Sequence, residues 1–241
     1  MKNRFIATFL TLLLISVLYH DEKNIQTVWN NENFNDSILI IDAGHGGLDG
    51  GAVSVNGICE QYITLNISKK ADYLCTFLGI SSILTRNDDN SLDFNPSANI
   101  KENKVADTKA RTDFVNSFEN PFLISVHLNS FTDSQYHGAQ IFYNNYDISE
   151  NLANILQSQI KNSIDFSNER NALLVPASIY LIENTNCPAI IYECGFLSNE
   201  IEEKLLDTQE YQTKLAICMI SSYSKIQKEL NYETKNSISM L

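Results

Sequence analysis

Residues 38–51 read ILIIDAGHGGLDGG, a continuous apolar run followed by a loop rich in glycine. Four consecutive apolar residues bounded by turn-forming residues are typical of a strand that is buried on both faces. Such strands occur in parallel sheets covered by helices, so this stretch favours an α/β fold. His45 lies in the loop that follows the strand, and the glycines around it leave room for a ligand to approach the backbone.

The rest of the chain alternates between further strand and helix patterns. We expect helices over residues 60–78, 106–118, 148–164 and 208–230, and strands over residues 81–84, 122–126, 138–143 and 189–192, with residues 87–104 as a polar loop. This alternation predicts a single α/β domain with a mostly parallel, twisted sheet flanked by helices. Ligands of such sheets gather beyond the carboxyl ends of the strands.

Composition narrows the class of protein. The chain has 241 residues, 44% of them hydrophobic and 19% charged, which is typical of one globular domain with a short appendage. Its 17 basic and 29 acidic residues give a net charge of −12. A nucleic-acid-binding protein needs a basic surface, and so does a protein that adheres electrostatically to anionic lipid. The charge therefore argues against both.

The amino terminus has the pattern of an export signal. Lys2 and Arg4 precede an apolar run over residues 5–19, about 22 Å of helix compared with the ~30 Å hydrocarbon core. Because no small-x-small cleavage site follows, residues 1–20 are expected to be either a signal peptide or an uncleaved membrane anchor. Residues 21–36 are expected to be a polar linker, residues 37–228 the single folded domain and residues 229–241 a polar tail.

The sequence does not indicate a chemical role for the five cysteines. Their number is odd and none shows CxxC spacing, so the sequence indicates neither a disulfide framework nor a thiolate zinc site. Cys75 and Cys218 lie in apolar helical patterns and are expected to be small buried residues.

Candidate site residues follow three of the predicted strands. His45, His127 and Glu193 lie at or just beyond strand ends, and Glu60 begins the helix after the glycine-rich loop. Two imidazoles and one carboxylate form a three-ligand zinc site that leaves a position for water, and the remaining glutamate can then act as general base. Other interpretations remain open: each histidine could be structural, the glycines could cradle a phosphate, and Glu60 could simply favour a helix start.

A resemblance covers almost the whole body of the chain. The segments IDAGHGGLDGGAV (41–53), SVHLNS (125–130) and YECGFLSN (192–199), together with Glu60, resemble the zinc-dependent N-acetylmuramoyl-L-alanine amidases of bacterial cell walls. The resemblance implies one Zn²⁺ per chain on His45, Glu60 and His127, with Glu193 as the catalytic glutamate. The implied reaction is hydrolysis of the peptidoglycan amide between the lactyl group of N-acetylmuramic acid and L-alanine.

A narrower likeness is to the germination-specific amidases of endospore formers. It rests on HGAQIFY (137–143), on Ile179-Tyr180-Leu181 and on the short amino-terminal apolar segment. It implies a role in spore-cortex processing on the extracytoplasmic side of the membrane, and an activating lipoprotein partner that the sequence does not identify. The rival interpretations are a zinc deacetylase or peptidase of the same polymer, and a non-catalytic wall-binding protein.

Four further polar residues are candidates for roles around the site. Asn129, Arg86 and Arg111 could contact substrate, although for both arginines we favour a structural role, such as pairing with Asp88 or Asp113 at the surface. Asp42 ends the first strand and is expected to orient a ligand imidazole.

Overall fold

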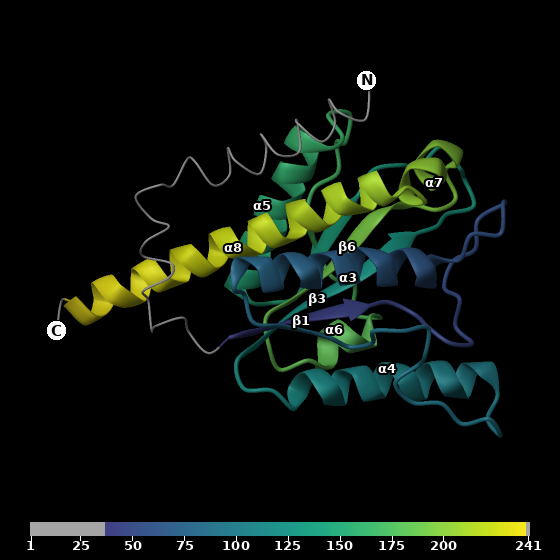
Figure 1. Cartoon of the computed structure of the whole chain (residues 1–241), viewed down its shortest axis with the longest axis horizontal. Helices are drawn as coiled ribbons and strands as arrows, with labels where there is room; N and C mark the ends of the chain where they lie inside the picture. Colours follow the sequence, from purple (N-terminus) through teal and green to yellow (C-terminus); the bar gives the residue numbers. More distant parts are fainter. Residues whose placement is uncertain (1–36, 240–241) are drawn as a thin grey trace. The chain divides into compact units, whose positions relative to one another are not determined.

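A six-stranded sheet lies at the centre of residues 37–239, the part of the chain that this computed structural model describes (Figure 1). Its strands are β1 (Ile38–Ala43), β2 (Ser82–Leu84), β3 (Pro121–Asn129), β4 (Gln140–Tyr143), β5 (Leu173–Leu174) and β6 (Ala189–Phe196). Their spatial order is β2-β1-β3-β6-β4-β5. The β4–β6 pair is antiparallel and the other four pairs are parallel, which confirms the predicted mostly parallel sheet.

Helices cover both faces of this sheet (Figure 1). They are α3 (Glu60–Leu78), α4 (Ile100–Asn116), α5 (Asp147–Ser163), α6 (Tyr180–Asn184), α7 (Glu200–Leu206) and α8 (Gln209–Ser239). Side chains of α3, α5 and α8 pack on one face, and those of α4 and α6 on the other. Strand β1 is apolar along its length because both of its faces are buried. Leu39 and Ile41 point into the first core, on the side of α3, α5 and α8, and Ile40 points into the second core, on the side of α4 and α6.

The bounds of α3 match the prediction because its pattern is regular. Ile63, Ile67, Ala71 and Cys75 recur every four residues and are buried in the first core. The helix ends at Gly79, which adopts the left-handed conformation with φ 70°.

Helices α4 and α8 are longer than predicted. Helix α4 begins at Ile100, within the expected loop, because Asn99 and Glu102 form a reciprocal capping box. Helix α8 continues to Ser239, so the expected polar tail over residues 229–241 is helical through that residue. The short elements β5, α6 and α7 were not predicted.

The predictions for the amino terminus lie outside the described residues. The signal or anchor over residues 1–20 and the linker over residues 21–36 both fall there. Among residues 37–239, no helix combines the length and the apolar character required to cross a membrane.

Candidate metal centre and active site

The four predicted site residues come from three adjacent strands and one helix start. His45 follows β1, His127 lies in β3, and Glu193 lies in β6 directly opposite His127 in the parallel register. Glu60 is the first residue of α3. Because the parallel strands β1, β3 and β6 end at the same edge, their site residues gather at this carboxyl edge of the sheet.

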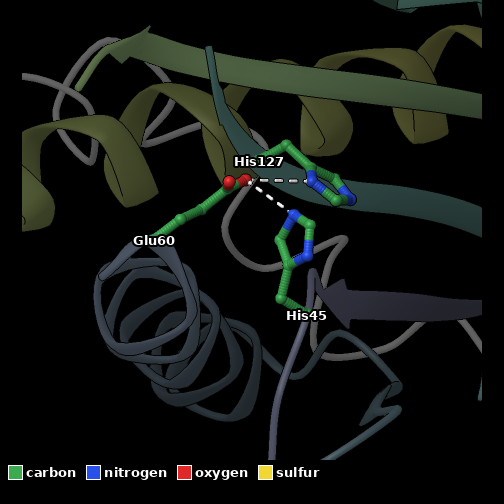
Figure 2. A group of neighbouring side chains, drawn as sticks. All are labelled: His45, Glu60 and His127. Atoms are coloured by element: carbon green, nitrogen blue, oxygen red, sulfur yellow. Dashed lines mark hydrogen bonds and ion pairs between the residues drawn. The ribbon is translucent and has the colours of Figure 1, made fainter. Parts of the chain in front are cut away.

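Three of these side chains form a compact group that could hold a metal ion. One ligand atom each from His45, Glu60 and His127 lies within 4.8 Å of the others. Glu60 Oε1 is 3.2 Å from His45 Nε2 and 3.1 Å from His127 Nδ1 (Figure 2). Two imidazole nitrogens and a carboxylate oxygen are a donor set that suits Zn²⁺, so the residues fit the metal that the resemblance implies.

Backbone donors hold Glu60 in place. Its Oε2 accepts a hydrogen bond from the Ala52 N–H at 2.8 Å, and its Oε1 accepts one from the Leu128 N–H at 2.8 Å. Burial opposes its charge, but hydrogen bonds with the two imidazoles keep the pKa of Glu60 well below its usual value. The carboxylate is therefore ionised as a metal ligand must be.

Asp49 orients the imidazole of His45. Its Oδ2 lies 2.9 Å from His45 Nδ1, which leaves Nε2 facing Glu60. The other oxygen, Oδ1, pairs with Lys104 Nζ at 2.6 Å and accepts the Gly51 N–H at 3.1 Å. Burial opposes the charged imidazole, but the carboxylates of Asp49 and Glu60 raise the pKa of His45 to about 9. Sequence reasoning missed Asp49, although it lies only four residues beyond His45.

Two glycines make room for the ligand side chains. A Cβ at Gly44 would overlap the imidazole of His127. A Cβ at Gly51 would lie 2.6 Å from Glu60 Oε2, and Gly51 also has a positive φ of 68°. At these two positions, glycine permits the close approach of the His127 and Glu60 side chains.

The expected role of Asp42 is corrected by the structure. Asp42 is 1% exposed and binds no imidazole; its Oδ1 accepts hydrogen bonds from Thr85 and Arg111, and its Oδ2 accepts one from Ser125. It is the buried partner of Arg111, 2.6 Å away.

Arg86 and Arg111 are likewise buried, and among the described residues neither forms an ion pair with the carboxylate of Asp88 or Asp113; Arg86 instead donates to the backbone oxygen of Asp88 at 2.8 Å. Arg86 donates to the backbone oxygens of Ala43 and Gly44, and Arg111 donates to those of Ala43 and His45. Arg111 pairs with Asp42 and Asp107, not with Asp113. Both guanidinium groups thus fix the main chain that carries His45, which agrees with the structural role favoured from the sequence.

Asn129 and Cys194 flank the site residues on β3 and β6. Asn129 is half-buried, and its Oδ1 accepts the Ser130 N–H at 2.9 Å. Cys194 is fully buried in the first core, because successive residues of a strand point to opposite faces. The thiol therefore packs away from Glu193.

Glu193 combines burial with an unsatisfied oxygen. Its Oε2 is shielded from solvent and has no hydrogen-bond partner among the described residues. Burial, together with the nearby Glu60 carboxylate, raises the pKa of Glu193 to about 7. A buried carboxyl group that exchanges a proton near neutral pH is suited to general acid–base catalysis.

A mostly parallel α/β sheet with a His-Glu-His group and a buried glutamate at its carboxyl edge is an arrangement that could serve a metal-dependent hydrolase. Comparison with known proteins identifies the family. Residues 39–223 match the N-acetylmuramoyl-L-alanine amidase family, and the chain belongs to it. It is thus an N-acetylmuramoyl-L-alanine amidase, and peptidoglycan is its substrate. The match favours cleavage of the amide between N-acetylmuramic acid and L-alanine over the deacetylase, peptidase and non-catalytic interpretations.

Similar proteins agree with this assignment over most of their length. The chain is 31% identical to the germination-specific N-acetylmuramoyl-L-alanine amidase of Bacillus subtilis over 88% of each chain. It is 35% identical to the CwlD amidase of Clostridioides difficile, solved in complex with the GerS lipoprotein, with a TM-score of 0.76 over 79% of this chain and 98% of that one. An N-acetylmuramoyl-L-alanine amidase from Clostridium difficile 630 is 27% identical, with a TM-score of 0.68 over 79% and 96%.

Proposed function

We propose that this amidase is a zinc hydrolase in which His45, Glu60 and His127 hold one Zn²⁺ and Glu193 is the catalytic acid–base. One observation carries the proposal: three ligand atoms lie within 4.8 Å of one another beside a strand whose glutamate has a buried, unpartnered oxygen. The scissile bond is the amide between the lactyl group of N-acetylmuramic acid and L-alanine.

Different residues of the site have different roles in the proposed reaction. Zinc, when bound, supplies a Lewis acid for the amide carbonyl and lowers the pKa of water. Backbone donors on Glu60 and the Asp49 carboxylate on His45 hold the ligands ready, so little rearrangement is needed. Glu193 accepts a proton from the attacking water as the new C–O bond forms. It then donates that proton to the L-alanine nitrogen as the C–N bond breaks.

The biological setting is also part of the proposal. The 31% identity to a germination-specific amidase supports a role in processing spore cortex. The C. difficile relative was solved with a lipoprotein, which supports a lipoprotein partner for this chain. Because peptidoglycan lies outside the cytoplasm, we infer that the enzyme is exported and that residues 1–20 direct it to, or hold it at, the outer face of the membrane. We also propose that Asn129 contacts substrate near the metal.

Digestion of purified muropeptides by the full chain, with and without a chelator, tests the function. Mass analysis should find free stem peptide that begins with L-alanine, and its release should stop when the chelator removes the metal. Release of acetate would identify a deacetylase, and shortened stem peptides would identify a peptidase. Either product, or chelator-resistant release of intact stem peptide, would overturn the proposal.

A further inference from the structure

The segment over residues 130–138 borders the active site at both of its ends. It leaves β3 after His127, which is opposite Glu193 on one side of β6. It returns in β4 at Gln140, which is opposite the same Glu193 on the other side of β6. Because the two strands that this segment connects both pair with β6 at Glu193, the segment forms part of the rim of the site.

Aromatic side chains of this segment form a row that is open to solvent. Phe131 is 55% exposed and Tyr136 is 44% exposed, and their ring centroids lie 5.0 Å apart, edge to face. Tyr136 also stacks on Phe196, the last residue of β6, with centroids 6.3 Å apart and an interplanar angle of 26°. The row therefore begins at the end of the catalytic strand and continues outward across the rim.

Hydrogen bonds hold this segment against the end of β6 and the start of α7. The Phe131 N–H donates to Ser198 Oγ at 3.0 Å, and Asn199 Nδ2 donates to the Ser134 oxygen at 2.9 Å. The Gly138 N–H donates to Glu202 Oε1 at 3.0 Å. Rings presented in this way are ordered before a ligand arrives, which reduces the entropy cost of binding.

We propose that Phe131 and Tyr136 form a subsite for the sugar rings of the glycan strand that carries the scissile amide. This subsite rests on the proposed function, since it extends the same active site. One face of a pyranose ring presents C–H groups with partial positive charge, and the faces of aromatic rings are negative. Stacking of sugar on ring therefore requires no ionic partner.

Charge favours the glycan over the stem peptide as the occupant. Stem peptides carry carboxylates, whose recognition calls for cations. Arg170, a cation beside these rings, already donates to the His137 oxygen and to Gln140 Oε1, and its guanidinium carbon lies 4.5 Å from the Phe196 ring centroid. The segment itself contributes an acid, Asp133. Its surface is thus aromatic and, in part, acidic.

Binding of two ligands to full chains tests the subsite. Binding is measured in the Glu193→Gln background so that neither ligand is hydrolysed. The shorter ligand is N-acetylmuramoyl tetrapeptide, and the longer ligand is two linked disaccharide units that bear the same peptide. The longer ligand should bind more tightly. Phe131→Ala and Tyr136→Ala should each weaken the longer ligand by about three- to tenfold more than the shorter one.

Two controls separate stacking from other effects. Tyr136→Phe retains the ring and should keep the length preference. Phe166→Ala removes another exposed ring, 84% exposed on the segment between α5 and β5, and should also keep it. The subsite would be overturned if the Glu193→Gln chain bound the two ligands with equal affinity. It would also be overturned if the preference for the longer ligand were the same in Phe131→Ala and Tyr136→Ala as in the Glu193→Gln chain alone. If the wild-type chain releases no stem peptide while binding still depends on both rings, the proposed function fails and the subsite holds.

Discussion

Glu60 and Glu193 have the same type of side chain, but their surroundings shift the pKa values of the two carboxyl groups in opposite directions. Two imidazoles and two backbone N–H groups surround Glu60 and stabilise its negative charge. Glu193 has an oxygen that is buried without a donor, and its pKa rises to about 7. Glu60 is therefore suited to bind a cation and Glu193 to carry a proton. Divergent environments of this kind separate a ligand from an acid–base group.

Replacing Asp49 tests how the structure orients His45. In Asp49→Asn the charge beside His45 Nδ1 is lost, and Lys104 loses its ion-pair partner. Metal affinity should fall by about 10- to 100-fold, as is usual when a partner that orients a ligand is removed. Competition with a chromophoric chelator measures this change. Asp113→Asn, an exposed aspartate on α4, is the matched control, and an equal affinity in both variants would contradict the assignment.

The identity of the imidazole's partner was the main residue-level error from sequence. The motifs of the family resemblance single out the two histidines and both glutamates, and the structure brings His45, Glu60 and His127 together. Which aspartate faces His45 depends on the loop conformation, and His45 itself adopts a positive φ of 64°. No apolar pattern reports that conformation, so Asp42 was chosen where Asp49 was correct.

Strand β1 and helix α4 are joined by the buried Asp42–Arg111 pair. Burial opposes the charge of Asp42, but Arg111 and the hydroxyls of Ser125 and Thr85 lower the pKa of Asp42 to about 2. Its folded pKa lies below the ordinary value of 3.8, so the charged carboxylate stabilises the fold above about pH 4. That contribution is lost as the pH falls toward 2.

Comparison with Asp42→Asn isolates this pH dependence. The stability difference between wild type and variant should shrink by about 2 kcal/mol between roughly pH 4 and pH 2. Urea unfolding at each pH gives the free energy of unfolding of each protein. Subtracting the two values removes the pH-dependent contributions of the carboxylates that both proteins share. A difference that stays constant over this range would contradict the pair's role.

Gly44→Ala tests the packing between β1 and β3. The added Cβ would overlap the His127 ring, so we expect the ring to move and metal affinity to fall at least about tenfold. Gly57→Ala is the control, because Gly57 has φ 83° and nothing within 4 Å of an added Cβ. It should cost about 1 kcal/mol of stability from backbone strain and leave metal binding unchanged. Full metal affinity in Gly44→Ala would refute this prediction.

Regular elements could be predicted from the sequence, and short or polar ones could not. Helix α3 shows apolar residues every four positions and was placed correctly. The first turn of α4 has no such pattern; its start depends on the Asn99–Glu102 capping box, which the apolar periodicity does not contain. The partners of Arg86 and Arg111 in β1 could not be predicted because they are more than 40 residues away in sequence, and only the folded sheet brings them together.

At the scale of the whole molecule, the net charge of −12 should repel the protein from an anionic cell wall. Long-range repulsion between like charges is screened by salt. Turnover on intact peptidoglycan should therefore rise as ionic strength increases from roughly 50 to 300 mM. Release of stem peptide at each salt concentration measures the effect, with a soluble uncharged substrate analogue as the control. A steep fall with salt would indicate capture by a basic surface and contradict this account.

The most direct test of the central claim is zinc content and stem-peptide release measured on the same sample of Glu193→Gln. The three proposed metal ligands, His45, Glu60 and His127, are untouched in this variant, so it should retain one zinc per chain. Its turnover should fall by at least about 100-fold, because the acid–base group is gone. Undiminished turnover would remove Glu193 from the mechanism, and loss of the zinc would show that Glu193 belongs to the metal site instead.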